Sequence, residues 1–367
     1  MKKDKFNFYK QFKNKTVIVT GHTGFKGSWL SSWLVLLGAK VIGLSINVPS
    51  SPSHFKAINL KSKIKNKKID IRNLKLLKKS FKKYQPDYVF HLAAQSLVKK
   101  SYSDPIYTWT TNTIGTLNIL ESLKEIKKSC VAVLITSDKS YKNLEIKRGY
   151  KEEDILGGKD PYSASKASAE LAIKSHINSY FPIKKTKILI GIARAGNVVG
   201  GGDWSEGRLM PDCARSWAKN KKVLIRNPKS TRPWQHVLEA ISGYLLLALN
   251  LKKNKKLHGE AFNFGPGNNN EYSVIFLVKL MKKYWKNVSW RVENKKKGKF
   301  YESNLLKLNS NKAKLKLKWK SILSFAETID MVSNWYKDYY SRPHHATQIT
   351  FDQIKKYEKI FKKRSIK

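Results

Sequence analysis

Cysteine is nearly absent from this chain of 367 residues, which contains only Cys130 and Cys213. The two cysteines have no paired spacing, so the sequence predicts neither a disulfide framework nor a zinc site. We therefore expect no bound metal. We also expect a protein of a reducing compartment, which places it in the cytoplasm.

Long hydrophobic runs are also missing. No stretch of about 20 apolar residues occurs, which is the length that a membrane-spanning helix needs. The N-terminal segment MKKDKFNFYKQFKNK is basic and lacks the apolar core of a secretory signal. We therefore expect no membrane insertion.

Acidic residues and arginine are both scarce. The chain has 26 Asp and Glu against 73 Lys and Arg, a net charge of +47, and only ten of the basic residues are arginine. Proteins that bind nucleic acid gather their basic residues on one face and use arginine where geometry matters. Lysine is spread here through almost every segment. We interpret it as solvated surface and expect no specific nucleic-acid partner.

Short apolar segments alternate with helix-like segments from residue 15 onward. This alternation predicts an α/β fold, with a doubly wound parallel Rossmann sheet and a smaller α/β substrate-binding lobe. The expected elements are strands at 16–21, 40–45, 87–94, 130–138 and 261–266, and helices at 73–84 and 232–251, the last one long and amphipathic.

The pattern changes after about residue 196, where a glycine-rich loop interrupts it. We therefore divide the chain into segments. They are an N-terminal arm at 1–14, a dinucleotide-binding Rossmann domain at 15–196 with 233–266, a substrate-binding lobe at 197–232 with 267–340, and a basic C-terminal tail at 341–367.

Three glycines, Gly21, Gly24 and Gly27, separate the first predicted strand from the helix that follows it. Glycine there permits a tight turn and a close approach of the backbone to a pyrophosphate, and the helix N-terminus favours an anion. The alternative is a helix start that only needs flexibility. The place of the loop at the first strand-to-helix junction favours dinucleotide binding.

The residues after the second predicted strand do not decide between NAD and NADP. Ser45, Ile46 and Asn47 stand where an Asp or Glu would bind the adenosine ribose of NAD, and no Arg is present for the 2′-phosphate of NADP. Asp70 closes the third predicted strand. It is either an acceptor for the adenine amino group or a helix cap.

Tyr162 and Lys166 lie four residues apart in a predicted helix, with Asp160 as its N-cap and Pro161 at its first position. A tyrosine with a pKa of about 10 is no base at neutral pH. A lysine cation one turn away, together with a cationic nicotinamide, would lower that pKa. The alternative is an incidental aromatic–cation pair.

Polar side chains also stand at the exit of the strand that begins near Cys130. They are Ser137, Asp138 and Lys139. Ligands bind at the carboxyl ends of strands in an open α/β sheet. This segment is therefore either an active site or a salt-bridged corner.

Several segments carry a resemblance to a known family. TGHTGFKG, HLAAQ, TSDK and YSASK, in this order and spacing, resemble the extended short-chain dehydrogenase/reductases. With ARAGNVVGGGDW, RPWQHVLEA and FNFGP, they are similar to the nucleotide-sugar 4,6-dehydratases, in particular those that act on CDP-glucose. The similarity runs from about residue 10 to 340.

The resemblance implies a hydro-lyase with NAD as cofactor and CDP-glucose as substrate, in deoxysugar synthesis for surface polysaccharide. The alternatives are another nucleotide-sugar 4,6-dehydratase, a 4-epimerase of the same fold, or a non-catalytic NAD-binding protein. It also implies a homodimer through a four-helix interface formed by 104–128 and 162–178. The implied cofactor-binding residues are Gly21, Thr23, Gly24, Phe25, Gly27, Asp70, Ile71, Ala93, Ala94, Gln95, Tyr162 and Lys166.

The same resemblance implies the roles of the catalytic residues. Tyr162 takes the proton of the C4 hydroxyl, Ser137 orients that hydroxyl, and Lys166 holds the nicotinamide ribose. Asp138 is the acid for the departing C6 hydroxyl, and Lys139 is either the C5 base or an enolate stabiliser. The implied ligands of the nucleotide diphosphate are Asn197, Arg208 and Arg232.

Overall fold

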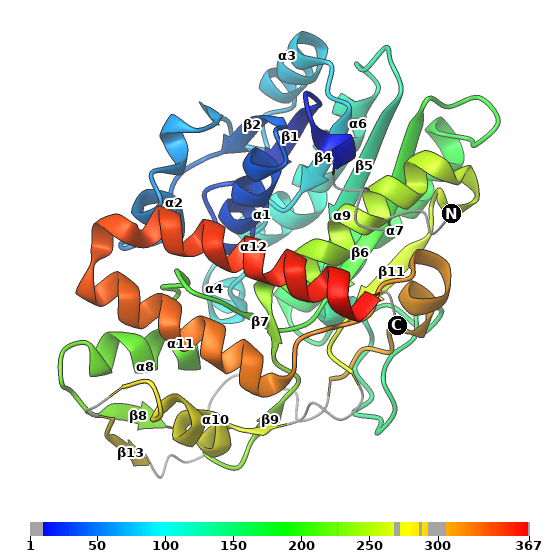
Figure 1. Ribbon diagram of the computed structural model, residues 1–367. Coiled ribbons are helices and arrows are strands. Elements are labelled where there is room, and N and C mark those ends of the chain that lie inside the picture. The colour runs from blue at the N-terminus through cyan, green and yellow to red at the C-terminus, as the bar shows by residue number, and fades with distance from the viewer. Residues whose placement is uncertain (1–9, 226, 268–271, 286–287, 293–305, 366–367) are drawn as a thin grey trace.

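The centre of the structure is a seven-stranded sheet in the order β11-β6-β5-β4-β1-β2-β3, with every neighbouring pair parallel (Figure 1). The computed structural model describes residues 10–225, 227–267, 272–285, 288–292 and 306–365. The predicted doubly wound α/β fold is confirmed. The strands are β1 (Thr16–Thr20), β2 (Lys40–Ser45), β3 (Lys65–Lys68), β4 (Tyr88–His91), β5 (Cys130–Ile135), β6 (Ile188–Ala195) and β11 (Ala261–Phe264).

Alternate side chains of each strand enter separate cores on the two faces of the sheet. Val17 and Val19 belong to one core, whereas Ile18 belongs to the other. Ile18 is in register with Ile42 of β2 and Val89 of β4, and both lie in the same core as Ile18. This alternation explains why the strands read as continuous apolar runs, since both faces of the sheet are buried.

Helices cover both faces. One face is covered by α3 (Leu74–Tyr84), α6 (Gly115–Leu123) and α7 (Pro161–Tyr180). The other is covered by α1 (Phe25–Leu36), α9 (Val237–Lys253) and α12 (Ala346–Ser365). Short elements complete the Rossmann part: α2 (His54–Ala57), η2 (Leu60–Ser62), α4 (Val98–Ser103), α5 (Pro105–Trp109), η3 (Thr110–Ile114), η4 (Asp138–Ser140) and η5 (Lys255–Leu257).

Helix α9 differs from its prediction in two ways. It begins at Val237 and not at residue 232, because β9 (Thr231–Arg232) and β10 (Gln235–His236) occupy the first residues and His236 caps the helix. It is also buried on nearly all sides, so the prediction of an amphipathic helix was wrong. A helix between a sheet and a second layer of helices has no solvated face.

Smaller elements form the second lobe, at the lower edge of Figure 1. They include two-stranded pairs between β8 and β13 and between β9 and β12, and a further pair joins β7 and β10 beside α9. No helix within the described residues is long and apolar enough to cross a membrane. The remaining elements are β7 (Val198–Val199), α8 (Leu209–Trp217), β8 (Val223–Ile225), β12 (Tyr272–Ser273), α10 (Val274–Met281), β13 (Trp290–Val292), η6 (Ala313–Leu317), α11 (Phe325–Ser341) and η7 (Pro343–His345).

The two ends of the chain are held by the Rossmann part. Residues 1–9 of the expected N-terminal arm lie outside the described residues, but Phe12 is fully buried against Tyr88. The expected C-terminal tail is instead the helix α12, which crosses α1 and buries Ile354 and Tyr357 (Figure 1). Its apolar face makes it part of the core, and its lysines remain on the outer face.

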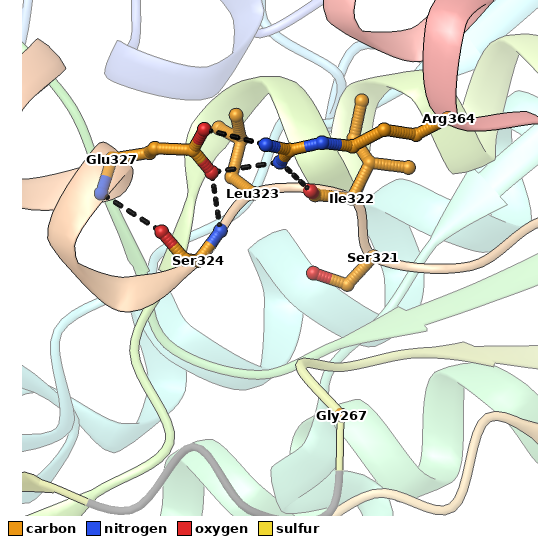
Figure 2. A pocket seen from close by; sticks show the side chains of 7 residues that line it. All are labelled: Gly267, Ser321, Ile322, Leu323, Ser324, Glu327 and Arg364. Carbon is orange, nitrogen blue, oxygen red and sulfur yellow. Dashed lines mark hydrogen bonds and ion pairs between the residues drawn. The ribbon is translucent and has the colours of Figure 1, made fainter.

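A carboxylate and a guanidinium fasten the end of α12 to the start of α11. Arg364 Nη1 donates to Glu327 Oε2 at 2.7 Å, and Arg364 Nη2 donates to Glu327 Oε1 at 2.7 Å. Figure 2 shows this pair on the wall of an open pocket, with Ser324 forming a capping box with Glu327. The pocket is lined by elements of the C-terminal region and by Gly267, and it does not include Tyr162 or Lys166.

Glu239 of α9 joins the same region from inside the core. Its Oε1 accepts the backbone N–H groups of Ile322 at 2.9 Å and Leu323 at 2.7 Å, and its Oε2 accepts the Tyr357 hydroxyl at 2.8 Å. Burial raises the pKa of Glu239 to about 7. The carboxyl group therefore keeps its proton at a pH where an exposed Glu is ionised.

We predict that the stability of the protein relative to a Glu239→Gln variant falls as the pH rises from 5 to 8. The carboxyl binds a proton up to a pH of about 7 when folded but only up to about 4.5 when unfolded. Its stabilising effect is thus complete below about 4.5 and is lost as the pH rises through 7. The full effect is about 3 kcal/mol. Thermal unfolding of both proteins across this range measures it, and a pH-independent difference in Tm would contradict it.

Candidate active site

The glycine loop between β1 and α1 lies against the segment that follows β4. Gly21 has a φ of 73°, and a Cβ there would lie 2.7 Å from the backbone nitrogen of Ala93. A Cβ at Gly27 would lie 2.1 Å from the carbonyl oxygen of Gly21. The two positions therefore require glycine for backbone approach, which goes beyond the alternative of simple flexibility.

The N-terminus of α1 is free of side-chain caps. Its N-cap is Gly24, which has no side chain to accept a hydrogen bond. The N–H groups of the first turn are thus left to an external acceptor, and the helix dipole favours an anion there. Thr23 is held beside the loop, since its Oγ1 donates to the carbonyl of Asn47 at 2.6 Å. Phe25 lies against Gly200.

Asp70 lies beyond β3, where its carboxylate is bound by Arg72. Arg72 Nε donates to Asp70 Oδ2 at 2.9 Å, and the Arg72 backbone N–H donates to Oδ1 at 2.9 Å. Burial alone would raise the pKa of Asp70, but these bonds from Arg72 lower it. The interpretation as a helix cap was wrong, because Asn73 is the N-cap of α3 and accepts from Leu76.

The remaining expected cofactor residues surround the exit of β4. Gln95 uses its side chain inside the fold, with Nε2 donating to Thr108 Oγ1 at 2.9 Å. Ile71 is buried against Gly115, and Ala93 lies beside the glycine loop. Ala94 follows Ala93 on the same segment and is half-buried. These residues would contact a cofactor through their backbone and apolar surface, and not through polar side chains.

The polar exit of β5 folds into a short turn, η4. Ser137 caps the turn, with its Oγ accepting the Lys139 backbone N–H at 3.2 Å and donating to Asp138 Oδ1 at 2.9 Å. Asp138 is buried, and burial raises its pKa, although the charge of Lys139 opposes this. Lys139 is half-buried and lines a narrow recess with Asp160 and Ser163. Burial therefore favours the protonated, acid form of Asp138.

Helix α7 brings Tyr162 and Lys166 to this turn. Asp160 caps the helix by accepting from the Ser163 N–H at 3.0 Å, and Pro161 is its first residue, as predicted. Tyr162 is buried and hydrogen-bonded to Ser137.

The ionisation of the tyrosine and the lysine is set mainly by burial. Burial raises the pKa of Tyr162 to about 12, while the hydrogen bond with Ser137 and the charge of Arg208 lower it. Burial lowers the pKa of Lys166 to about 8, assisted by the nearby cation of Lys26. The protein environment thus leaves the phenol protonated, and a further nearby cation is needed to favour the phenolate.

The sequence predictions missed Lys26, which lies in the first turn of α1. Its charge acts on Asp138, Lys166 and Arg208, so it belongs to the same cluster. Burial lowers the pKa of Lys26 to about 8. A lysine in the first turn of a helix opposes the helix dipole, and this anomaly is the sequence signal that points to it.

The three expected diphosphate ligands lie in different places. Arg208 donates from Nη1 to Asp203 Oδ2 at 2.8 Å, and its charge reaches Tyr162. Arg232 lies on β9, where its Nη1 donates to the Thr231 carbonyl at 2.8 Å. Asn197 is exposed after β6. Of the three, Arg208 is the residue whose charge acts on Tyr162.

A parallel Rossmann sheet with a glycine loop after β1, and a serine, a tyrosine and a lysine gathered at the exit of β5, define a short-chain dehydrogenase/reductase. The profile of the GDP-mannose 4,6 dehydratase family matches residues 18–332. The chain therefore belongs to this family.

Individual relatives agree with this assignment. The chain is 43% identical over 330 residues to CDP-glucose 4,6-dehydratase of Salmonella typhimurium, covering 89% of this chain and 91% of that protein. Among solved structures, it is similar to the epimerase Mth375 of Methanothermobacter thermautotrophicus, with a TM-score of 0.77, 25% identity and coverage of 93% and 97%. It shares its fold with dTDP-glucose 4,6-dehydratase of Bacillus anthracis, solved with NAD, with a TM-score of 0.71, 22% identity and coverage of 89% and 98%.

Proposed function

We propose that the protein is an NAD-dependent CDP-glucose 4,6-dehydratase, which converts CDP-glucose to CDP-4-keto-6-deoxyglucose. The observation that carries the proposal is the buried acid Asp138, followed by Lys139, beside the Tyr162–Lys166 pair. Oxidation alone does not need such an acid, whereas elimination of water does. The 43% identity to CDP-glucose 4,6-dehydratase of Salmonella typhimurium supports the same reaction and substrate.

The residues around the glycine loop fit NAD. The uncapped N-terminus of α1 would hold its pyrophosphate, and the close approach of Gly21 to Ala93 leaves no side chain in the way. A bound NAD would supply the hydride acceptor for C4 of the sugar and the hydride donor for C6, so that no net oxidation would occur. Lys166 would hold the nicotinamide ribose, and Asp70 would accept from the adenine amino group.

Tyr162 and Ser137 serve the C4 hydroxyl. Ser137 orients the hydroxyl and Tyr162 accepts its proton, for which Tyr162 must first be a phenolate. The charge of Arg208 already lowers the pKa of Tyr162 and still leaves it at about 12, so the cation of the oxidised nicotinamide would supply the further charge. The burial that raises the pKa of Tyr162 in the free protein is thus offset in the complex.

Asp138 and Lys139 serve the elimination. Burial raises the pKa of Asp138 and so favours the acid form, which would donate a proton to the departing C6 hydroxyl. Lys139 either removes the C5 proton or stabilises the enolate that forms when this proton leaves. Asn197, Arg208 and Arg232 would bind the nucleotide diphosphate. We also place the enzyme in the cytoplasm, in the synthesis of deoxysugars for lipopolysaccharide or another surface polysaccharide.

We predict that the purified protein with NAD converts CDP-glucose to a product lighter by one water. The product absorbs as a keto sugar in alkali, no net NADH forms, and in D₂O one deuterium enters at C5. Mass spectrometry and NMR of the product measure each of these. Turnover of dTDP-, GDP- or UDP-sugars instead would contradict the nucleotide assignment, and a sugar inverted at C4 would show an epimerase.

Lys139→Ala should reduce kcat by about 10²-fold or more, because a positioned general acid or base contributes this much. Deuterium incorporation at C5 should slow to the same extent, because each turnover places one solvent hydrogen there. Lys139→Arg separates the two roles, since arginine stays protonated: it preserves activity only if Lys139 stabilises the enolate. Lys142→Ala, at an exposed position three residues further on, is the matched control. Normal turnover and exchange in Lys139→Ala would contradict the assignment.

We further propose a homodimer formed through α5 and α7. These helices lie in contact, and both expose large apolar side chains, among them Ile106 at 74% and Leu171 at 59%. Trp109 and Ile114 continue the exposed apolar surface. A patch of this kind on a water-soluble fold indicates an interface, and four helices, two from each copy, would cover it.

We expect Leu171→Glu to convert the dimer to a monomer in sedimentation equilibrium, because the charge would be buried at the interface. Leu315→Glu is the matched control, since Leu315 is 68% exposed on η6 and lies outside α5 and α7. A wild-type protein that sediments as a monomer would contradict the proposal.

A further inference from the structure

A buried ion pair lies between α7 and β6, and the proposed chemistry does not use it directly. Glu170 and Arg194 are both 0% exposed, and Arg194 Nε donates to each carboxylate oxygen at 2.9 Å. Such a pair is a poor way to gain stability, because the loss of hydration offsets the attraction between the charges. Its remaining hydrogen bonds indicate what else it does.

One of those hydrogen bonds goes from Arg194 Nη1 to the Glu152 carbonyl, and two go to residues on either side of the turn at 137–139. Thr136 Oγ1 donates to Glu170 Oε1 at 2.6 Å, and Arg194 Nη1 donates to the Tyr141 hydroxyl at 2.6 Å. The Arg194 guanidinium also lies over the Tyr141 ring, 4.6 Å from its centroid. Thr136 directly precedes residues 137–139, and Tyr141 follows them after one residue. The pair is therefore hydrogen-bonded to residues before and after the turn at 137–139.

The same pair belongs to the helix that carries the tyrosine and the lysine. Glu170 lies one turn after Lys166 and two turns after Tyr162 on α7. Its carboxylate raises the pKa of Lys166, against the lowering caused by burial. Glu170 thus touches the turn through Thr136 and acts on Lys166 through its charge.

We propose that Glu170 and Arg194 are positioning residues that hold the turn at 137–139 and the helix α7 at the separation that the reaction requires. The pair sets the distance from Ser137 and Asp138 to Tyr162, and neither member touches the substrate. This proposal rests on the proposed function, because it assigns the pair to the oxidation and elimination steps.

Two conservative substitutions remove the hydrogen bonds between the ion pair and the residues beside the turn, and leave the ion pair itself intact. Thr136→Val removes the bond to Glu170, and Tyr141→Phe removes the bond to Arg194 and one to Asn263. Thr111→Val and Tyr88→Phe are matched controls, since neither hydroxyl has a hydrogen-bond partner among the described residues although both are buried.

The double variant Thr136→Val with Tyr141→Phe should show a kcat about 10- to 100-fold lower, with KM within about twofold of the wild type. It should also show a larger deuterium isotope effect on kcat with substrate labelled at C4, because misplacement slows hydride transfer selectively. The controls should leave both quantities unchanged. A double variant with a lower Tm, but with wild-type kcat per active site and a wild-type isotope effect, would overturn the proposal.

The wild-type assay tests the proposed function separately. If the protein turns over another nucleotide sugar, the assignment of CDP-glucose fails, and the same variants are compared on that sugar with the same expected results.

If the protein turns over no sugar, the proposal can be tested by chemical acetylation of Lys166, which needs no substrate. Glu170→Gln removes the anion beside Lys166, so Lys166 should be half-acetylated by acetic anhydride at a lower pH than in the wild type. Mass spectrometry of the peptides measures this, with exposed Lys174 on the same helix as control. Half-acetylation of Lys166 at the wild-type pH would overturn the proposal.

Discussion

The packing of α7 against the carboxyl end of β5 is the constraint on which the candidate site depends. Thr136, the residue after β5, donates from Oγ1 to Glu170 Oε1 of α7 at 2.6 Å. Small residues also let α7 pack closely against η3, where the fully buried Ser165 accepts from Asn112 Nδ2 at 2.9 Å. A Cβ at Gly158 would lie 2.3 Å from the Ala164 nitrogen, so the preceding loop also lies tightly on the helix. Through this packing Tyr162 meets Ser137, although 25 residues separate them in the chain.

Burial then decides what each charged group can do. It penalises charge of either sign, so the same surroundings raise the pKa of Asp138 and lower those of Lys26 and Lys166 to about 8. The result is a carboxyl group that holds a proton more readily than an exposed Asp, next to amines that release theirs more easily than exposed lysines. Acid and base character in this site therefore follows from depth in the fold, and the residue types alone do not determine it.

The sequence was sufficient for the features that depend on local pattern. The parallel sheet, the glycine loop and the cap of α7 by Asp160 all follow from spacing and residue type, and the structure contains them. Glu170 and Arg194 could not be predicted, because they are 24 residues apart and no periodicity links them. The place of α12 was missed for the same reason, since its contact with Glu239 joins residues 118 positions apart.

The resemblance implies that two of the ten arginines, Arg208 and Arg232, bind a diphosphate, and the planar fork of arginine suits that group. Within the described residues, however, seven arginines lie within 4.0 Å of a carboxylate, namely Arg72, Arg148, Arg194, Arg208, Arg215, Arg342 and Arg364. In this chain most of the described arginine guanidinium groups therefore pair with Asp or Glu side chains. The assignment of Arg208 to a diphosphate therefore rests on its place beside Tyr162 and not on its rarity.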